Sequence, residues 1–166
     1  MLQPLRMPSE AEPARLGRLA KLPVFFDLRN RRAVLVGGSA GAAWKAELLA
    51  AAGADVDIYA ADPSPEMETL LARGGADGSL TLHRSAWSAE ILKDAALAVA
   101  DLEDEEEAKA VAAAARAAGV PVNVVDKPAF CDFQFGSVVN RSPVVIGIST
   151  DGAATVLGVQ RSPVSS

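Results

Sequence analysis

A doubly wound α/β fold with a parallel sheet is the architecture that this sequence predicts. Short apolar runs alternate with helical segments between residues 33 and 125, and the first run passes directly into a glycine-rich turn. Such alternation implies parallel strands joined by crossover helices, which cover both faces of the sheet. With 166 residues, half of them hydrophobic, the chain is long and apolar enough for one domain of this kind.

The strands are predicted from apolar runs that end in turn residues. They are expected at residues 33–36, 55–59, 80–83, 96–100 and 120–125. Helices are expected between them, where glycine, proline and acidic residues mark the ends. The helical segments are residues 42–52, a helix opened by Asp62-Pro63-Ser64-Pro65 that continues to about Arg73, residues 89–92 and residues 105–118.

The pattern changes after Asp126, because no helix separates the next two apolar segments, 130–139 and 144–149. They predict a short extended pair whose exposed edge a partner subunit would cover. We therefore divide the chain into a mobile lead-in (1–21), a folded nucleotide-binding domain (22–126) and a dimerisation segment with a short tail (127–166).

Composition narrows the class of partner and the compartment. The net charge of −5 argues against nucleic acid or an anionic membrane as the main partner, since both recruit clustered lysine and arginine. No membrane span and no secretory signal are expected. The single cysteine, Cys131, has no partner for an intrachain disulfide, which favours the cytoplasm. With His83 as the only histidine, no resident metal site is expected.

The glycine-rich turn is the first candidate site. Its residues are Gly37, Gly38, Ser39, Ala40 and Gly41. A strand that ends in such a turn lets a pyrophosphate approach the backbone, and the N-terminus of the next helix attracts its charge, as in Rossmann-like domains. Ser39 stands where the middle glycine of the fingerprint is expected, and its hydroxyl can donate to a phosphate. The alternative is a tight connection that binds nothing.

Acidic residues at strand ends are the other candidates. Asp62, after the second strand, either contacts a ribose or caps the next helix. Asp101 ends the fourth strand and opens an acidic stretch, 101–107, which we interpret as a solvated helix start. Asp126 ends the fifth strand, where it is either a general acid or base or a turn residue. Ser149, Thr150, Asp151 and Gly152 form either a turn or a loop that binds anionic groups.

Four ordered motifs resemble the precorrin-2 dehydrogenase/ferrochelatase module of siroheme synthase. They are Leu22-Pro23-Val24-Phe25, Val36-Gly37-Gly38 with Lys45, Asn123-Val124-Val125-Asp126, and Arg141-Ser142-Pro143 leading to Ile148-Ser149-Thr150-Asp151-Gly152. The resemblance covers residues 22 to about 157. It implies NAD-dependent oxidation of precorrin-2 to sirohydrochlorin, and in some members insertion of ferrous iron, which is then a substrate. It also implies a homodimer formed through the segment after Asp126.

Carried over by position, the resemblance makes Asp126 the catalytic aspartate and places NAD contacts on Ala40, Gly41, Ala61 and Asp62. The family usually has a third glycine at Ser39 and a small residue at Asp101, and it continues into a helical domain beyond residue 157. The alternative is therefore a shortened, catalytically silent or impaired module that binds a dinucleotide or assists assembly.

Overall fold

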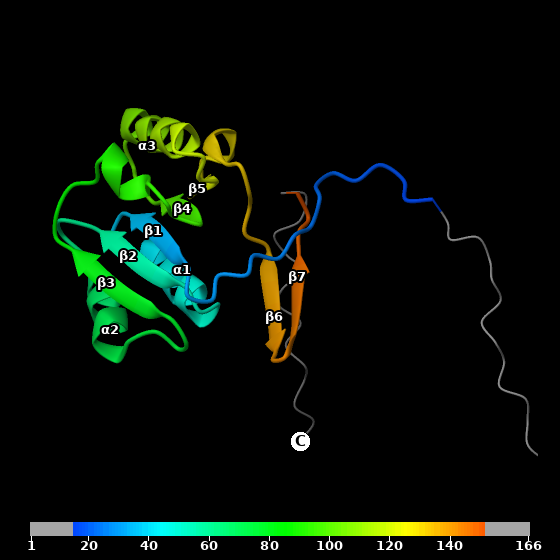
Figure 1. The fold of residues 1–166 in the computed structure, drawn as a ribbon, viewed down its shortest axis with the longest axis horizontal. Coiled ribbons are helices and arrows are strands. Elements are labelled where there is room, and N and C mark those ends of the chain that lie inside the picture. Colours follow the sequence, from blue (N-terminus) through cyan, green and yellow to red (C-terminus); the bar gives the residue numbers. More distant parts are fainter. Residues whose placement is uncertain (1–14, 152–166) are drawn as a thin grey trace, which may run out of the picture. The chain divides into compact units, whose positions relative to one another are not determined.

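The computed structural model describes residues 15–151 and divides the chain into two compact units. One unit is Phe25–Phe135. The other joins Met1–Val24 to Gly136–Ser166, of which residues 15–24 and 136–151 are described. The first unit contains the parallel sheet and the second contains a hairpin, so each is considered by itself (Figure 1).

Five parallel strands form the sheet in the order β3-β2-β1-β4-β5, as the doubly wound prediction requires. They are β1 (Arg32–Val36), β2 (Asp55–Tyr59), β3 (Ser79–His83), β4 (Leu97–Ala100) and β5 (Val122–Val124). The chain moves outward from β1 to β3 and then returns to pair β4 with the other side of β1. The order of the strands therefore reverses beside β1, and open parallel sheets bind ligands at the carboxyl ends of the strands at such a switch point.

Three α-helices connect the strands, and a capping side chain determines where each begins. They are α1 (Ala40–Ala51), α2 (Pro65–Arg73) and α3 (Glu105–Ala117), capped by Ser39, Ser64 and Asp104, respectively. The segment Ala89–Leu92 forms a short 3-10 helix, η1. Within residues 15–151, none of the helices has the length and apolar character needed to cross a bilayer.

The cap of α2 corrects one expectation from the sequence. Asp62 was a candidate for this role, but the Ser64 hydroxyl accepts the N–H of Met67 at 3.2 Å. Pro65 then occupies the first helical position, where a missing N–H costs nothing. The helix thus begins three residues after Asp62 and leaves that carboxylate exposed in the β2–α2 loop.

Two apolar layers hold the helices against opposite faces of the sheet (Figure 1). Leu35 and Ile58 pack toward α1 and α2, together with Met67 from α2. Val34 packs toward α3, together with Val111 from that helix. Because neighbouring residues of a strand face opposite sides, the continuous apolar sequence of β1 supplies both layers.

A polar network lies on the α3 side of β2 and β3. Arg32 Nε donates to Asp57 Oδ2 at 2.5 Å, and His83 Nε2 lies 2.9 Å from Asp57 Oδ1. The ring of Tyr59 stacks on that of His83, with centroids 4.5 Å apart. Burial raises the pKa of Asp57, but hydrogen bonds from His83 and Arg32 and their charges outweigh burial, so this pKa lies below its ordinary value.

The second unit contains an antiparallel hairpin of β6 (Ser137–Arg141) and β7 (Val144–Ile148). Its first strand is shorter than the predicted segment 130–139, because residues 131–135 instead run alongside β5. Asp132 exchanges two hydrogen bonds with Val122, one from its backbone N–H at 2.7 Å and one to its carboxylate at 3.1 Å. Phe133 and Phe135 pack against the apolar layer beneath α1.

The Asp57 network predicts a change in acid stability. Its folded pKa is lowered, so its stabilising contribution is complete above about pH 4 and is lost as the pH falls through that folded pKa. We expect Asp57→Asn to reduce the free energy of unfolding by about 1–3 kcal/mol at pH 7, with the deficit shrinking toward pH 2. Urea unfolding across this range measures it.

Asp55→Asn is the matched control, because Asp55 is also on β2 but accepts from the Ser79 hydroxyl and not from a cation. A deficit for Asp57→Asn that stays constant from pH 7 to pH 2 would contradict this account of the network.

Candidate functional site

The first two glycines of the turn allow close packing between strand ends. Gly37 has a φ of +120°, and a Cβ added there would lie 2.3 Å from the backbone carbonyl oxygen of Asp101. A Cβ on Gly38 would lie 2.8 Å from the Cβ of Ala60. Side chains at these positions would therefore separate the loop after β1 from the loops after β4 and β2.

The next three residues open α1 toward solvent. Ser39, Ala40 and Gly41 are exposed, and the Ser39 hydroxyl accepts the N–H of Ala42 at 3.1 Å. Ala40 and Gly41 carry other N–H groups of the first turn, which an α-helix cannot satisfy internally. These exposed backbone groups, at the positive end of the helix dipole, fit the pyrophosphate of a dinucleotide.

Asp101, which follows β4, places a negative charge beside this turn, and that charge disfavours an anionic ligand. Its carboxylate accepts a hydrogen bond from the Ser39 hydroxyl. A Cβ on Gly41 would lie only 3.0 Å from Asp101 Oδ2, so the carboxylate lies over the first turn of α1. The sequence placed Asp101 near the crevice, but its contact with Ser39 depends on the pairing of β4 with β1.

Asp126 lies in the tight turn that follows β5. It is exposed and has a φ of +59°, a left-handed conformation that aspartate tolerates better than most residues. Val125 donates its N–H to the Ala100 carbonyl at 2.9 Å, and the Lys127 ammonium donates to the Leu102 carbonyl at 3.1 Å. These two bonds hold the loop that carries Asp126 against the loop after β4.

Lys45, on α1, is a further residue of the site. In the sequence it stood out only as part of a family motif and not as a binding residue. Its side chain is half-buried, and its ammonium lies 4.1 Å from the centre of the Phe135 ring. Burial lowers the pKa of Lys45, and the charges of Asp126 and Asp101 partly oppose this shift. Its spacing of four residues from Gly41, one turn along α1, was the available signal.

The proposed ribose contacts lie in the β2–α2 loop. Ala61 and Asp62 are exposed, and the Ser64 N–H donates to the Gly38 carbonyl at 2.8 Å. This bond brings the loop beside the glycine turn, where the Asp62 carboxylate is not used as a helix cap. The arrangement is consistent with a ribose contact for Asp62, which stays a prediction.

The predicted substrate loop lies in the other unit. Ser149, Thr150 and Asp151 follow β7, and Asp151 pairs with Lys21 at 2.8 Å. Gly152 lies outside the described residues. The part of these residues in substrate binding therefore stays a prediction.

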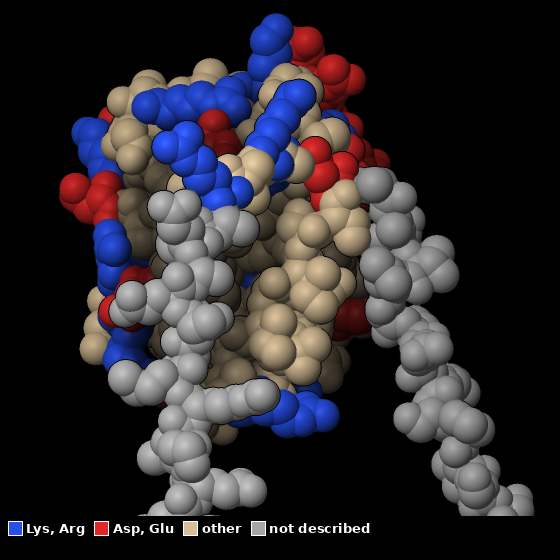
Figure 2. Space-filling view, turned by 90° about the vertical axis from the view of Figure 1, so that its right-hand side faces the viewer, with Lys and Arg blue, Asp and Glu red and all other residues tan. Residues whose placement is uncertain are grey.

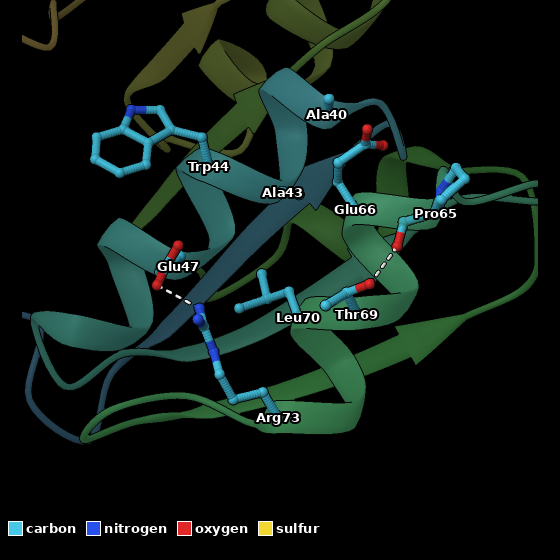
Figure 3. Close-up of a pocket in the computed structure, with 9 residues that line it drawn as sticks. All are labelled: Ala40, Ala43, Trp44, Glu47, Pro65, Glu66, Thr69, Leu70 and Arg73. Atoms are coloured by element: carbon cyan, nitrogen blue, oxygen red, sulfur yellow. Dashed lines mark hydrogen bonds and ion pairs between the residues drawn. The ribbon is translucent and has the colours of Figure 1, made fainter.

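A groove between α1 and α2 is separate from the strand ends (Figure 3). Trp44 and Glu47 line it from α1, and Arg73 crosses from α2 to pair with Glu47. Of the predicted site residues, only Ala40 reaches it. Across residues 15–151, no three metal-binding side chains converge on one point.

Residues 24–137 match the model of a protein family described as "Putative NAD(P)-binding". The chain belongs to this family. That membership agrees with the exposed start of α1 and confirms the predicted NAD cofactor at the level of the family. The domain also resembles a solved structure described as "SirC, precorrin-2 dehydrogenase", with a TM-score of 0.67 and 24% identity. The match covers 82% of this chain and 65% of the other, and it confirms the Rossmann-like fold.

Among curated proteins, the chain is similar to several named siroheme synthase, as the motifs of the sequence indicated. It is 44% identical over 138 residues to that of Thiobacillus denitrificans and 38% identical over 135 residues to that of Psychrobacter cryohalolentis. These matches cover 82% and 81% of this chain but only 28% and 25% of the relatives. The chain thus spans little more than a quarter of their length.

The close approach at Gly37 predicts that this NAD(P)-binding domain does not tolerate a side chain there. Gly37→Ala places a Cβ against the Asp101 carbonyl and requires a strained φ, which alone costs about 1–3 kcal/mol. We expect a loss of more than about 2 kcal/mol in the free energy of unfolding, measured by urea denaturation.

Gly41→Ala is the control. It lies in the first turn of α1, and its new Cβ would meet only the movable Asp101 carboxylate and Ser39 hydroxyl. A change within about 1 kcal/mol is expected because alanine favours helices. Equal losses for both variants would contradict the packing role of Gly37.

Proposed function

We propose that this chain is an NAD-dependent dehydrogenase that oxidises precorrin-2 to sirohydrochlorin in siroheme biosynthesis. The observation that carries the proposal is that Asp126, after β5, lies at the same carboxyl end of the sheet as a dinucleotide-binding turn. The charge of Asp126 also raises the pKa of Lys45 on α1, against the effect of burial. The names of the relatives, siroheme synthase and precorrin-2 dehydrogenase, indicate the substrate. An oxidation of this kind requires both a hydride acceptor and a base.

The nicotinamide of NAD, when bound, supplies the hydride acceptor. The side chains of this chain have the remaining tasks. We assign Asp126 as the base that takes the proton lost from the substrate, and its exposed position gives a large planar ligand access to it. The pyrophosphate would be held by the glycine turn, which consists of Gly37, Gly38, Ser39, Ala40 and Gly41. The ribose would be held by Ala61 and Asp62. Lys45 offers a positive charge near Asp126 for a carboxylate of the tetrapyrrole.

Insertion of ferrous iron into sirohydrochlorin is the second reaction we assign to Asp126. The same carboxylate can accept the pyrrole protons that leave when the metal enters, and iron is then a substrate. Insertion that persists without NAD would separate this reaction from the oxidation.

An impaired dinucleotide-binding or assembly module is the alternative. The contact between Ser39 and Asp101 favours it, because it places a carboxylate at the start of α1. NAD binding without oxidation of precorrin-2 would support this alternative.

Removal of the Asp126 charge tests the dehydrogenase. We expect Asp126→Asn to lower the rate of precorrin-2 oxidation by about 100-fold or more, because general bases contribute 10²–10⁴-fold. The Kd for NAD should change less than about twofold. NADH absorbance measures the rate and calorimetry measures the Kd.

Asp94→Asn is a matched control, since Asp94 is another exposed aspartate in a left-handed conformation, with a φ of +60°, and follows η1. Oxidation at the wild-type rate by Asp126→Asn would exclude Asp126 as the base. A wild-type chain that binds NAD but does not oxidise precorrin-2 would support the binding module.

We also propose a cytoplasmic homodimer formed through the hairpin. Valines and isoleucines of β6 and β7 are 42–58% exposed on both strands. Figure 2 shows a strip of uncharged side chains, drawn tan, on the face turned toward the viewer. A two-stranded hairpin is marginally stable alone, and an exposed apolar patch of this kind marks an interface. A second copy of the hairpin would cover these residues.

A charge on the hairpin should dissociate the dimer. Ile146 pairs with Val139 across the strands, and the two are 50% and 42% exposed. We expect Ile146→Asp to convert a species of twice the 17.1 kDa chain mass into a monomer, as measured by sedimentation equilibrium. Asn140→Asp adds the same charge at a polar position of β6 and should leave the dimer intact. A monomeric wild-type chain at tens of micromolar would refute the interface.

A further inference from the structure

We propose that Asp101 competes with the pyrophosphate of the dinucleotide for the start of α1 and thereby weakens cofactor binding by this chain. The inference rests on the proposed use of NAD. It concerns a residue outside the predicted binding set, and it makes Asp101 a determinant of affinity.

The contacts of Asp101 place its charge at the cradle. The Ser39 hydroxyl donates to the Asp101 carboxylate and accepts the N–H of Ala42, so one serine links the carboxylate to the first turn of α1. Oδ2 of Asp101 lies 3.0 Å from where a Cβ on Gly41 would be. A phosphate that approaches the N–H groups of Ala40 and Gly41 therefore meets this carboxylate.

The backbone of Asp101 cannot withdraw from that position. Its N–H donates to the Val36 carbonyl at 2.8 Å, and its own carbonyl packs against Gly37. Only rotation of the side chain, away from Ser39, can clear the turn. Dinucleotide binding must break the bond to Ser39 or hold two anions together at the end of one helix.

Charge neutralisation nearby is incomplete. The charges of Asp126 and Asp101 both oppose the lowering of the Lys45 pKa by burial, so one ammonium lies in the field of two carboxylates. The start of a helix carries only about half a positive charge. The Asp101 carboxylate and a bound pyrophosphate would both depend on this same partial positive charge.

The experiment measures binding of NAD, ADP and adenosine by calorimetry, with the wild-type chain and with Asp101→Asn. We expect the variant to bind NAD and ADP about tenfold more tightly, the size expected when one nearby like charge is removed in a partly solvated site. Adenosine lacks phosphate, so its Kd should stay within about twofold. Thermal unfolding confirms that the variants are folded.

Two further variants make the test specific. Glu103→Gln removes an exposed charge two residues away and should not change the Kd for NAD. Ser39→Gly keeps the Asp101 charge but removes its tether, at little cost to the helix because glycine also caps well. It should tighten NAD binding by less than Asp101→Asn does, and it serves as the test should the Asp101 variant not fold.

Unchanged or weaker NAD binding by Asp101→Asn would overturn the inference, the second result indicating that Asp101 accepts hydrogen bonds from the cofactor. An equal gain with Glu103→Gln or with adenosine would also overturn it, as an effect of overall charge. If neither the wild-type chain nor any folded variant binds NAD, the result contradicts the proposed function itself. Wild-type NAD binding with no gain in the variant leaves that function standing and removes only this inference.

Discussion

The close approach of Gly37 to the backbone of Asp101 is the constraint on which the site depends. β1 and β4 lie side by side at the point where the order of the strands in the sheet reverses, and the Asp101 N–H donates to the Val36 carbonyl there. Because Gly37 has no side chain, the turn after β1 and the loop after β4 meet without a gap. The start of α1 then lies at the switch point of the strand order, where open parallel sheets bind ligands.

The same contact has an electrostatic consequence. By bringing the loops together it also brings the Asp101 carboxylate to the Ser39 hydroxyl, and the charges of Asp126 and Asp101 raise the pKa of Lys45 against the effect of burial. Backbone groups that suit a dinucleotide are therefore combined with side-chain charges that partly oppose it.

Much of the sheet domain could be predicted from local pattern. β1 and β2 are continuous apolar or alternating runs, and α3 begins with an acidic first turn, so periodicity and end signals agree with the structure. Errors arose where two local signals compete. Asp62 and Ser64 are both good caps and each is followed by a proline, so the local sequence does not choose between them, and the helix begins after Ser64. Residues 131–135 have the composition of a strand, but hydrogen bonds between Asp132 and Val122 hold them along β5.

The sequence by itself determined the order of strands and helices, the glycine turn, the family motifs and the position of Asp126 at a strand end. These follow from residues that are neighbours in the chain, where periodicity and backbone preference act. Only the tertiary structure decided that Ser39, 62 residues before Asp101, is hydrogen-bonded to it, and that the half-buried Lys45 ammonium lies against the Phe135 ring. Such contacts depend on the pairing of β1 with β4 and on burial, which no local pattern specifies.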